Sequence, residues 1–321
     1  MLGAIIGDIV GSRWEFNPTN DYNFEWLSKE NGYTDDTICT VAVADALLKG
    51  REYGVSIHSW CQRYPHPMGG YGGRFSQWVG SDNPQPYNSY GNGAAMRVSP
   101  VAYWYDDENQ VLDAAAATAM PSHNHQEGVK GAQTVALAIY KALRYKYQDT
   151  PMHIDEILQE CVQFSGYDIN MPKASVINRF DETCQGTVPV ALKIISMASC
   201  FEDAVRLAVS LGADADTLGA ITGSIAEAIW GIPLGMRRSI EKYLPEDMLV
   251  IVHQFHCERP RSFKPLIDTC FTGDNFYDAS WDMLYDLEGK ETYKEFMNIT
   301  KDEHEQKRRL MAERAKAREE W

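Results

Sequence analysis

The sequence predicts an all-α protein, folded as a compact orthogonal bundle of many helices. Two observations predict this class: apolar residues recur at helical spacing along most of the chain, and the strict alternation typical of half-buried strands is scarce. Of the 321 residues, 44% are apolar and 23% charged, which are ordinary values for a globular protein. We expect one domain over residues 1–300, followed by a charged helical tail over 301–321.

Each expected helix has a signal of its own. The first carries Gly3, Gly7 and Gly11 one turn apart, a spacing that lets another helix backbone approach closely. The later helices have apolar residues at i, i+3 and i+4, and glycines such as Gly50 and Gly212 mark their ends. These later helices are expected over 38–50, 111–120, 128–147, 188–200, 201–212 and 217–231.

The segment 65–93 has a different composition, dense in glycine, proline, asparagine and aromatic residues. Loops of this length inside a compact domain usually serve a function or are disordered, and the aromatic content argues against disorder. The segment is therefore expected to be a binding loop that offers flat stacking surfaces.

Charge and composition exclude several classes of protein. Lys and Arg total 30 against 45 Asp and Glu, so the net charge of −15 argues against nucleic-acid binding. No stretch approaches the ~20 apolar residues of a membrane helix, and no secretion signal is expected. Seven cysteines without C-x-x-C spacing fit reduced thiols, which predicts a cytoplasmic protein.

Two acidic motifs, at 34–37 (Thr-Asp-Asp-Thr) and 214–217 (Asp-Ala-Asp-Thr), each stand directly before an expected helix. Either could simply cap its helix, because Asp and Thr accept hydrogen bonds from free backbone N–H groups there. Both motifs hold more carboxylates than a cap needs, and adjacent carboxylates repel unless a cation lies between them. Four aspartates would balance two divalent cations, and hard oxygen ligands suit Mg²⁺ or Mn²⁺.

Three further signals are weaker. Glu15 follows the first helix and is either a surface residue or a buried functional one. The loop 88–93 contains two glycines whose backbone N–H groups suit a phosphate, with Tyr90 able to stack on a base, or it is an ordinary tight loop. His123 is either a hydrogen-bonding site residue or a neighbour of a helix cap.

Together these segments resemble the ADP-ribosylglycohydrolase family, the DraG-like ADP-ribosylhydrolases. The most specific elements are T-D-D-T and D-x-D-T, each opening a helix. The resemblance covers Leu2 to about Pro233 and rests on GAIIGDIVGSRWE (3–15), YTDDT (33–37), GYG (70–72), SYGNGAAMRVSP (89–100), SHNH (122–125) and LGADADTLGAITGSIAEAIWG (211–231).

The resemblance implies the all-helical fold of that family and a centre of two Mg²⁺ or Mn²⁺ ions. The metal ligands it implies are Thr34, Asp35, Asp36, Asp214, Asp216 and Thr217. Glu15 matches an acidic residue beside the metals, and the candidate catalytic residues are Glu15, Asp35 and Asp36. The implied substrate-binding residues are Ser89, Tyr90, Gly91, Asn92, Gly93 and His123.

The implied activity is hydrolysis of the C1″ glycosidic bond between ADP-ribose and a side chain of an ADP-ribosylated protein. Free ADP-ribose would be released, and an arginine N-linkage is expected. The alternatives are a hydrolase for serine- or acetyl-linked ADP-ribose, a non-catalytic ADP-ribose-binding or structural relative, and a metal-dependent phosphoesterase. Ala213 and Glu227 replace glycines that are common in the family, and both are expected to alter metal affinity.

Overall fold

The computed structural model describes residues 1–147 and 152–259, together with 318 and 321. The chain divides into the units Met1–Lys264 and Pro265–Trp321, and the helices from α1 to α14 all belong to the first unit. Within these residues the regular structure is helical and no β-strand occurs, so the predicted all-α class is confirmed. The predicted boundary at residue 300 and nearly all of the charged tail lie outside the described residues.

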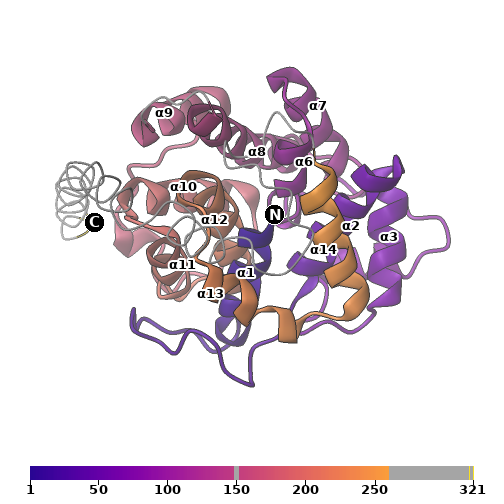
Figure 1. Cartoon of the computed structure of the whole chain (residues 1–321), viewed down its shortest axis with the longest axis horizontal. Coiled ribbons are helices and arrows are strands. Elements are labelled where there is room, and N and C mark those ends of the chain that lie inside the picture. The colour runs from indigo at the N-terminus through magenta and orange to yellow at the C-terminus, as the bar shows by residue number, and fades with distance from the viewer. Residues whose placement is uncertain (148–151, 260–317, 319–320) are drawn as a thin grey trace, which may run out of the picture. The chain divides into compact units, whose positions relative to one another are not determined.

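In the described part of the chain, the α-helices follow one another through irregular connections and three short 3₁₀ turns (Figure 1). All six later helices expected from apolar spacing are present, as α2, α7, α8, α10, α11 and α12, with ends shifted by no more than four residues. The bounds are α1 Leu2–Gly11, α2 Asp35–Lys49, α3 Tyr53–Arg63, α4 Gly73–Val79, α5 Gly93–Met96, α6 Ser99–Trp104, α7 Glu108–Ala119, α8 Gln126–Tyr147, α9 Ile154–Ser165, α10 Cys184–Met197, α11 Phe201–Val209, α12 Ala215–Trp230, α13 Leu234–Ser239 and α14 Glu246–Glu258.

The segment 65–93 is not entirely a loop, because it contains the short helix α4. Phe75, Trp78 and Val79 are buried from this helix, at the i, i+3 and i+4 spacing of an amphipathic helix. The surrounding glycines concealed this pattern in the sequence, so the prediction of a continuous loop was wrong for this part.

Helices α1 and α12 form the centre of the fold and run antiparallel in close contact (Figure 1). A Cβ atom at Gly11 would lie 2.6 Å from the Cα atom of Asp216, closer than real Cβ contacts allow. Gly7 faces Gly219 and Gly3 faces Gly223 in the same way, which confirms the close approach that the glycine spacing predicts. This contact brings the carboxyl-terminal end of α1 next to the first turn of α12.

The other helices surround this pair. Helices α8, α10 and α11 pack against α12, whereas α2 packs against α1 and is covered by α3 and α14 (Figure 1). Helix α2 is buried from Asp36 to Leu47 along most of its length, so its amino-terminal turn is held firmly beside α1. None of the described helices is long and apolar enough to span a bilayer.

Glu227 lies near the far end of α12 and binds the amino terminus of the chain. Its Oε2 atom accepts hydrogen bonds from the Met1 amino group at 2.7 Å and from the Gly3 N–H at 2.8 Å. Eleven residues of helix separate it from Asp216, which is about 16 Å at a rise of 1.5 Å per residue. The expectation that Glu227 lies beside metal-bearing residues was therefore wrong.

Candidate active site

The two acidic motifs, far apart in the sequence, meet at the first turns of α2 and α12. The Thr217 hydroxyl donates a hydrogen bond to Asp36 Oδ2 at 3.1 Å, which joins one motif to the other directly. Asp36 and Asp216 are only 1% and 2% exposed. The convergence that a shared metal centre requires is thus present in the fold.

Capping of helices explains only part of these motifs. The Thr34 hydroxyl caps α2 by accepting a hydrogen bond from the backbone N–H of Asp36 at 3.2 Å. Asp214 occupies the N-cap position of α12 but makes no capping hydrogen bond. Its Oδ2 atom instead accepts one from the side-chain amide of Asn92 at 2.7 Å, so the carboxylate turns toward the site.

The first group of carboxylates, the inner cluster, comprises Asp8, Asp36 and Asp216. Each offers an oxygen atom, and these oxygens lie within 4.8 Å of one another. Asp8 was not identified from the sequence, where it stands in the apolar run of the first helix. Its carboxylate accepts hydrogen bonds from the backbone N–H and hydroxyl groups of Thr34, at 3.0 and 2.8 Å, and from the same two groups of Thr37.

The second group, the outer cluster, comprises Glu15, Asp214 and Asp216, again with oxygens within 4.8 Å. Asp216 therefore belongs to both clusters. Glu15 lies just after α1, and a Cβ atom at Gly69 would come within 3.1 Å of the Glu15 carboxyl carbon. Gly69 also has a φ of +76°, so a glycine there is required both by conformation and by space.

Burial and mutual repulsion make these carboxylates hard to ionise without a cation. Burial raises the pKa of Asp8 to about 6 and that of Asp214 to about 7. Burial, together with the charges of Asp216 and Asp8, raises the pKa of Glu15 to about 8. Burial and neighbouring charges also raise two further pKa values well above their usual range: that of Asp36, beside Asp216, and that of Asp216, beside Asp214.

The donors available in the two clusters fit a hard divalent cation. Buried oxygens of Asp36 (Oδ1), Asp216 (Oδ1) and Glu15 (Oε2) have no hydrogen-bond partner among the described residues. Unpartnered buried carboxylate oxygens are costly unless an ion neutralises them. Carboxylate and hydroxyl oxygens are the ligands that Mg²⁺ and Mn²⁺ prefer.

Asp35 lies at the rim of this site. It is half-buried and belongs to neither cluster, although burial and the charges of Asp216, Asp8 and Glu15 raise its pKa. Asp35 is therefore the most exposed of the predicted metal ligands.

The loop 88–93 is attached to the site through Asn92, whose side-chain amide donates to Asp214 at 2.7 Å and to Thr187 at 3.1 Å. The prediction that this loop leaves free N–H groups for a phosphate was wrong at two positions. The Gly91 N–H donates to the Ser89 hydroxyl at 3.1 Å, and the Asn92 N–H donates to the Glu182 carbonyl at 2.7 Å.

A cavity of about 690 Å³ opens beside the outer cluster. This volume lies within the usual range for small-molecule sites. Asp214 and its neighbour Ala213 line one side of the cavity, and Tyr90, which is 48% exposed, lines another. Much of the remaining wall comes from residues of 166–190, a segment that the sequence did not mark as functional.

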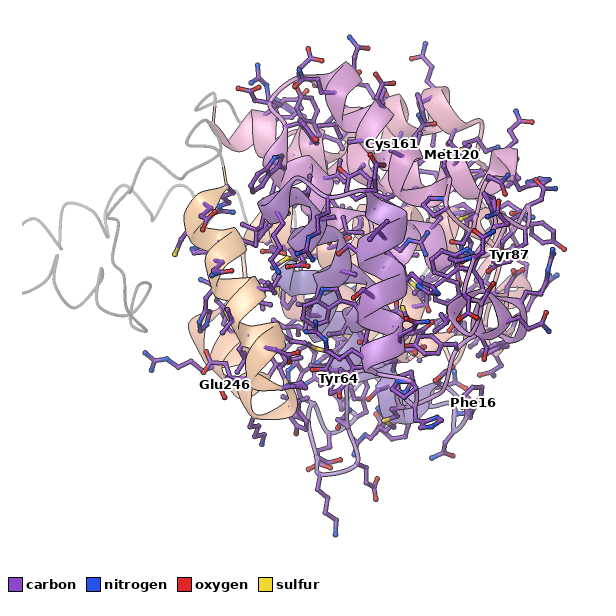
Figure 2. All side chains as sticks on the ribbon, turned by 90° about the vertical axis from the view of Figure 1, so that its right-hand side faces the viewer. Phe16, Tyr64, Tyr87, Met120, Cys161 and Glu246 are labelled. Atoms are coloured by element: carbon purple, nitrogen blue, oxygen red, sulfur yellow. The ribbon has the colours of Figure 1, made fainter. Side chains whose placement is uncertain are left out.

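His123 lies beneath the loop 88–93 and is only 5% exposed. It is not among the residues that line the cavity. The ring centres of Phe75 and Tyr87 lie 6.1 and 6.0 Å from that of His123, and Tyr87 is labelled in Figure 2. The fold thus brings His123 to the loop, although not to the open face of the cavity.

The structure is thus an all-α domain that gathers buried carboxylates at the starts of two helices, beside a cavity of about 690 Å³. The family model for ADP-ribosylglycohydrolase matches residues 1–262. The chain therefore belongs to the ADP-ribosylglycohydrolase family, and it is a hydrolase.

Individual relatives agree with this assignment. The chain is 24% identical to ADP-ribosylhydrolase ARH3 of Xenopus tropicalis, over 82% of this chain and 96% of that protein. It is also 24% identical to ADP-ribosylarginine hydrolase Tri1 of Pseudomonas putida, over 72% of this chain and 70% of that protein. A solved structure, the ADP-ribosylglycohydrolase-related protein complex, matches its fold with a TM-score of 0.62 at 24% identity, covering 79% of this chain and 96% of that chain.

Proposed function

We propose that the protein is a metal-dependent ADP-ribosylhydrolase that cleaves the C1″ glycosidic bond between ADP-ribose and a modified protein side chain, with an arginine N-linkage. The observation that carries this proposal is the position of Asp214. Its carboxylate belongs to the outer cluster, receives a hydrogen bond from the loop through Asn92, and lines the 690 Å³ cavity. One residue therefore joins the candidate metal centre to the candidate nucleotide site.

Two Mg²⁺ or Mn²⁺ ions would be held by the two acidic motifs. The unpartnered oxygens of Asp36 and Asp216, and the shared position of Asp216 in both clusters, support two adjacent ions. Divalent cations at such a site stabilise developing negative charge and lower the pKa of a bound water. The proposed ligands are Thr34, Asp35, Asp36, Asp214, Asp216 and Thr217.

The carboxylates of the chain would carry the proton and charge steps. Glu15 is the first candidate to accept the proton of the attacking water, because its Oε2 atom is buried, unpartnered and next to Asp214 and Asp216. Asp36 and Asp35 are the other candidates for this role. Positive charge that develops at the ribose carbon would be stabilised by the surrounding carboxylates, as in other glycoside cleavages.

The substrate would lie along the loop, with Tyr90 stacking on the adenine ring. Tyr90 is half-exposed and lines the cavity, which supports this role. Because two of the loop N–H groups are already bonded inside the protein, side chains rather than these amides would contact the phosphates and ribose. The proposed substrate-binding residues are Ser89, Tyr90, Gly91, Asn92, Gly93 and His123.

A pair of exposed aromatic rings, one of which directly follows Glu15 in the sequence, supports arginine as the acceptor. Phe16 directly follows Glu15 and is 70% exposed; Phe180 is 43% exposed, and the two rings stack 6.0 Å apart. Figure 2 shows Phe16 at the periphery of the molecule. A planar guanidinium group stacks well on such rings, and neighbouring carboxylates attract it. One relative is named as an ADP-ribosylarginine hydrolase.

The experiment is a panel of peptides carrying ADP-ribose on arginine, on serine or through an acetyl ester, incubated with Mg²⁺ and assayed for free ADP-ribose. The proposal predicts fastest release from the arginine linkage, and a higher KM for that substrate in Phe16→Ala. Release from none of them would overturn the enzymatic proposal. Binding of ADP-ribose that is indifferent to Mg²⁺ would favour a non-catalytic relative, and release of AMP or phosphate a phosphoesterase.

We further propose that the protein works in the cytoplasm. Six cysteines of the described residues are free thiols, including Cys39 and Cys61, whose sulfur atoms lie only 3.7 Å apart without a bond. Unbonded neighbouring thiols favour a reducing compartment.

A further inference from the structure

Arg97, directly after α5, carries a guanidinium group that is completely buried. Its Nη2 atom donates to the Thr118 carbonyl at 2.8 Å and to the Ser122 hydroxyl at 3.0 Å. No carboxylate forms an ion pair with it among the described residues, and its Nε and Nη1 atoms have no hydrogen-bond partner there. A buried arginine without an anionic partner is costly, so its placement calls for a reason.

The Ser122 hydroxyl connects this arginine to His123. It is fully buried and lies 2.8 Å from His123 Nδ1. Arginine can only donate hydrogen bonds, so the Ser122 oxygen accepts from Arg97. The hydroxyl proton is then free to point at His123 Nδ1, which must act as an acceptor; a proton on Nδ1 instead would leave the buried hydroxyl hydrogen unpaired.

The remaining ring nitrogen, Nε2, is directed at the glycines of the loop. A Cβ atom at Gly93 would lie 2.9 Å from Nε2, and one at Gly91 would lie 3.4 Å away. Only residues without side chains leave the ring this close to the backbone of the loop. The rings of Phe75 and Tyr87 flank the imidazole, both tilted against its plane, by 56° and 57°.

We propose that Arg97 and Ser122 are positioning residues that hold His123 in the neutral form with its proton on Nε2. The Nε2–H group, which faces Gly91 and Gly93, would donate a hydrogen bond to an oxygen of the substrate bound at the loop. Arg97, Ser122 and His123 together are called the relay. The inference rests on the proposed function, since the substrate is the nucleotide that the loop binds. The oxygen belongs to a hydroxyl or phosphate group, because a donor or a cation would meet the N–H unfavourably.

The neutral state agrees with the surroundings of the ring. Burial and the positive charge of Arg97 lower the pKa of His123 well below its usual value. The ring therefore recognises the substrate by donating a hydrogen bond and not by carrying charge.

Variants of Ser122 test the relay without removing a charge from the core. Ser122→Ala removes the hydroxyl that donates to Nδ1, and Ser122→Thr retains it. The matched control is Ser99→Ala, because Ser99 is also fully buried but its hydroxyl has no hydrogen-bond partner among the described residues. We expect Ser122→Ala to raise KM for the ADP-ribosylated peptide and the Kd for free ADP-ribose by about tenfold, the worth of one hydrogen bond.

Two readouts separate positioning from a merely structural effect. Nitrogen-15 spectra of the wild-type imidazole should show Nε2 protonated, with a mixture of tautomers in Ser122→Ala and the wild-type pattern in Ser122→Thr and Ser99→Ala. In a His123→Phe background, Ser122→Ala should have no further effect on the Kd for ADP-ribose. A proton on Nδ1 in the wild type, or an undiminished effect of Ser122→Ala without His123, would overturn the inference.

The outcomes for the relay and for the proposed function are distinguishable. If the wild type binds ADP-ribose but releases none from any substrate, the proposed function fails while the tautomer and the Kd still judge the relay. If the wild type is active and the Ser122 and Ser99 variants have equal KM and Kd values, only the relay fails.

Discussion

Replacing Gly11 by alanine tests how the fold builds the site. The added methyl carbon would lie 2.6 Å from the Cα atom of Asp216, whereas ordinary contacts begin at about 3.4 Å. The end of α1 and the start of α12 must therefore separate by about 0.8 Å at the residue that both clusters share. Mg²⁺ requires near-ideal geometry at about 2.1 Å, so this displacement is enough to disrupt its ligands.

We expect Gly11→Ala to lose about 1–3 kcal/mol of stability through overpacking. We also expect it to bind Mg²⁺ at least tenfold more weakly than the wild type. Thermal unfolding with and without Mg²⁺, together with calorimetric titration of the metal, measures both effects. The matched control is Gly73→Ala, because a Cβ atom at Gly73 meets nothing within 4 Å. A folded Gly11→Ala protein with wild-type metal affinity and activity would refute the claim that this helix contact sets the site.

Three other predictions concern Asp8, the pH dependence of stability, and Glu227. Asp8→Asn should weaken Mg²⁺ binding by about 10–100-fold in calorimetry, because the Asp8 carboxylate orients the hydroxyls of Thr34 and Thr37 around the inner cluster. In the presence of a chelator, the melting temperature should fall as pH rises from about 4.5 to about 8. The cause is that folding raises the pKa of Glu15 to about 8 and that of Asp214 to about 7, so ionisation of these groups favours the unfolded state. Saturating Mg²⁺ should abolish this pH dependence, and a pH dependence that Mg²⁺ leaves unchanged would contradict the prediction. Glu227→Gln should lower the free energy of unfolding, measured with denaturant, by about 2 kcal/mol, because it weakens the hydrogen bonds from the Met1 amino group and the Gly3 N–H. Its Mg²⁺ affinity should stay unchanged, and a changed affinity would contradict the prediction.

The helices of this fold were predictable because their burial follows a simple period. Apolar residues at helical spacing located α2, α7, α8, α10, α11 and α12, and glycines one turn apart predicted the close contact of α1. Helix α4 escaped prediction because two glycines precede Phe75, and a seven-residue helix offers only one repeat of the pattern.

The candidate site was predictable where carboxylates stood at helix starts, and not elsewhere. Asp8 was hidden because its neighbours in α1 are all apolar or glycine, although a charged residue in so apolar a helix was itself a signal of function. Glu227 misled for the opposite reason, because sequence proximity to Asp216 along one helix is not proximity in space. The partners of Asn92 and His123 depend on tertiary contacts that no sequence pattern encodes.

The central claim is that the two carboxylate clusters bind two divalent cations through the shared Asp216. The most direct measurement is calorimetric titration of the metal-free protein with Mg²⁺, comparing the wild type with Asp216→Asn. We predict two ions per chain for the wild type and loss of binding in Asp216→Asn, whose metal-free form should be at least as stable as the wild type because a buried repulsion is removed. A wild type that takes up no Mg²⁺ or Mn²⁺, or an Asp216→Asn variant with the full number of ions, would contradict the account.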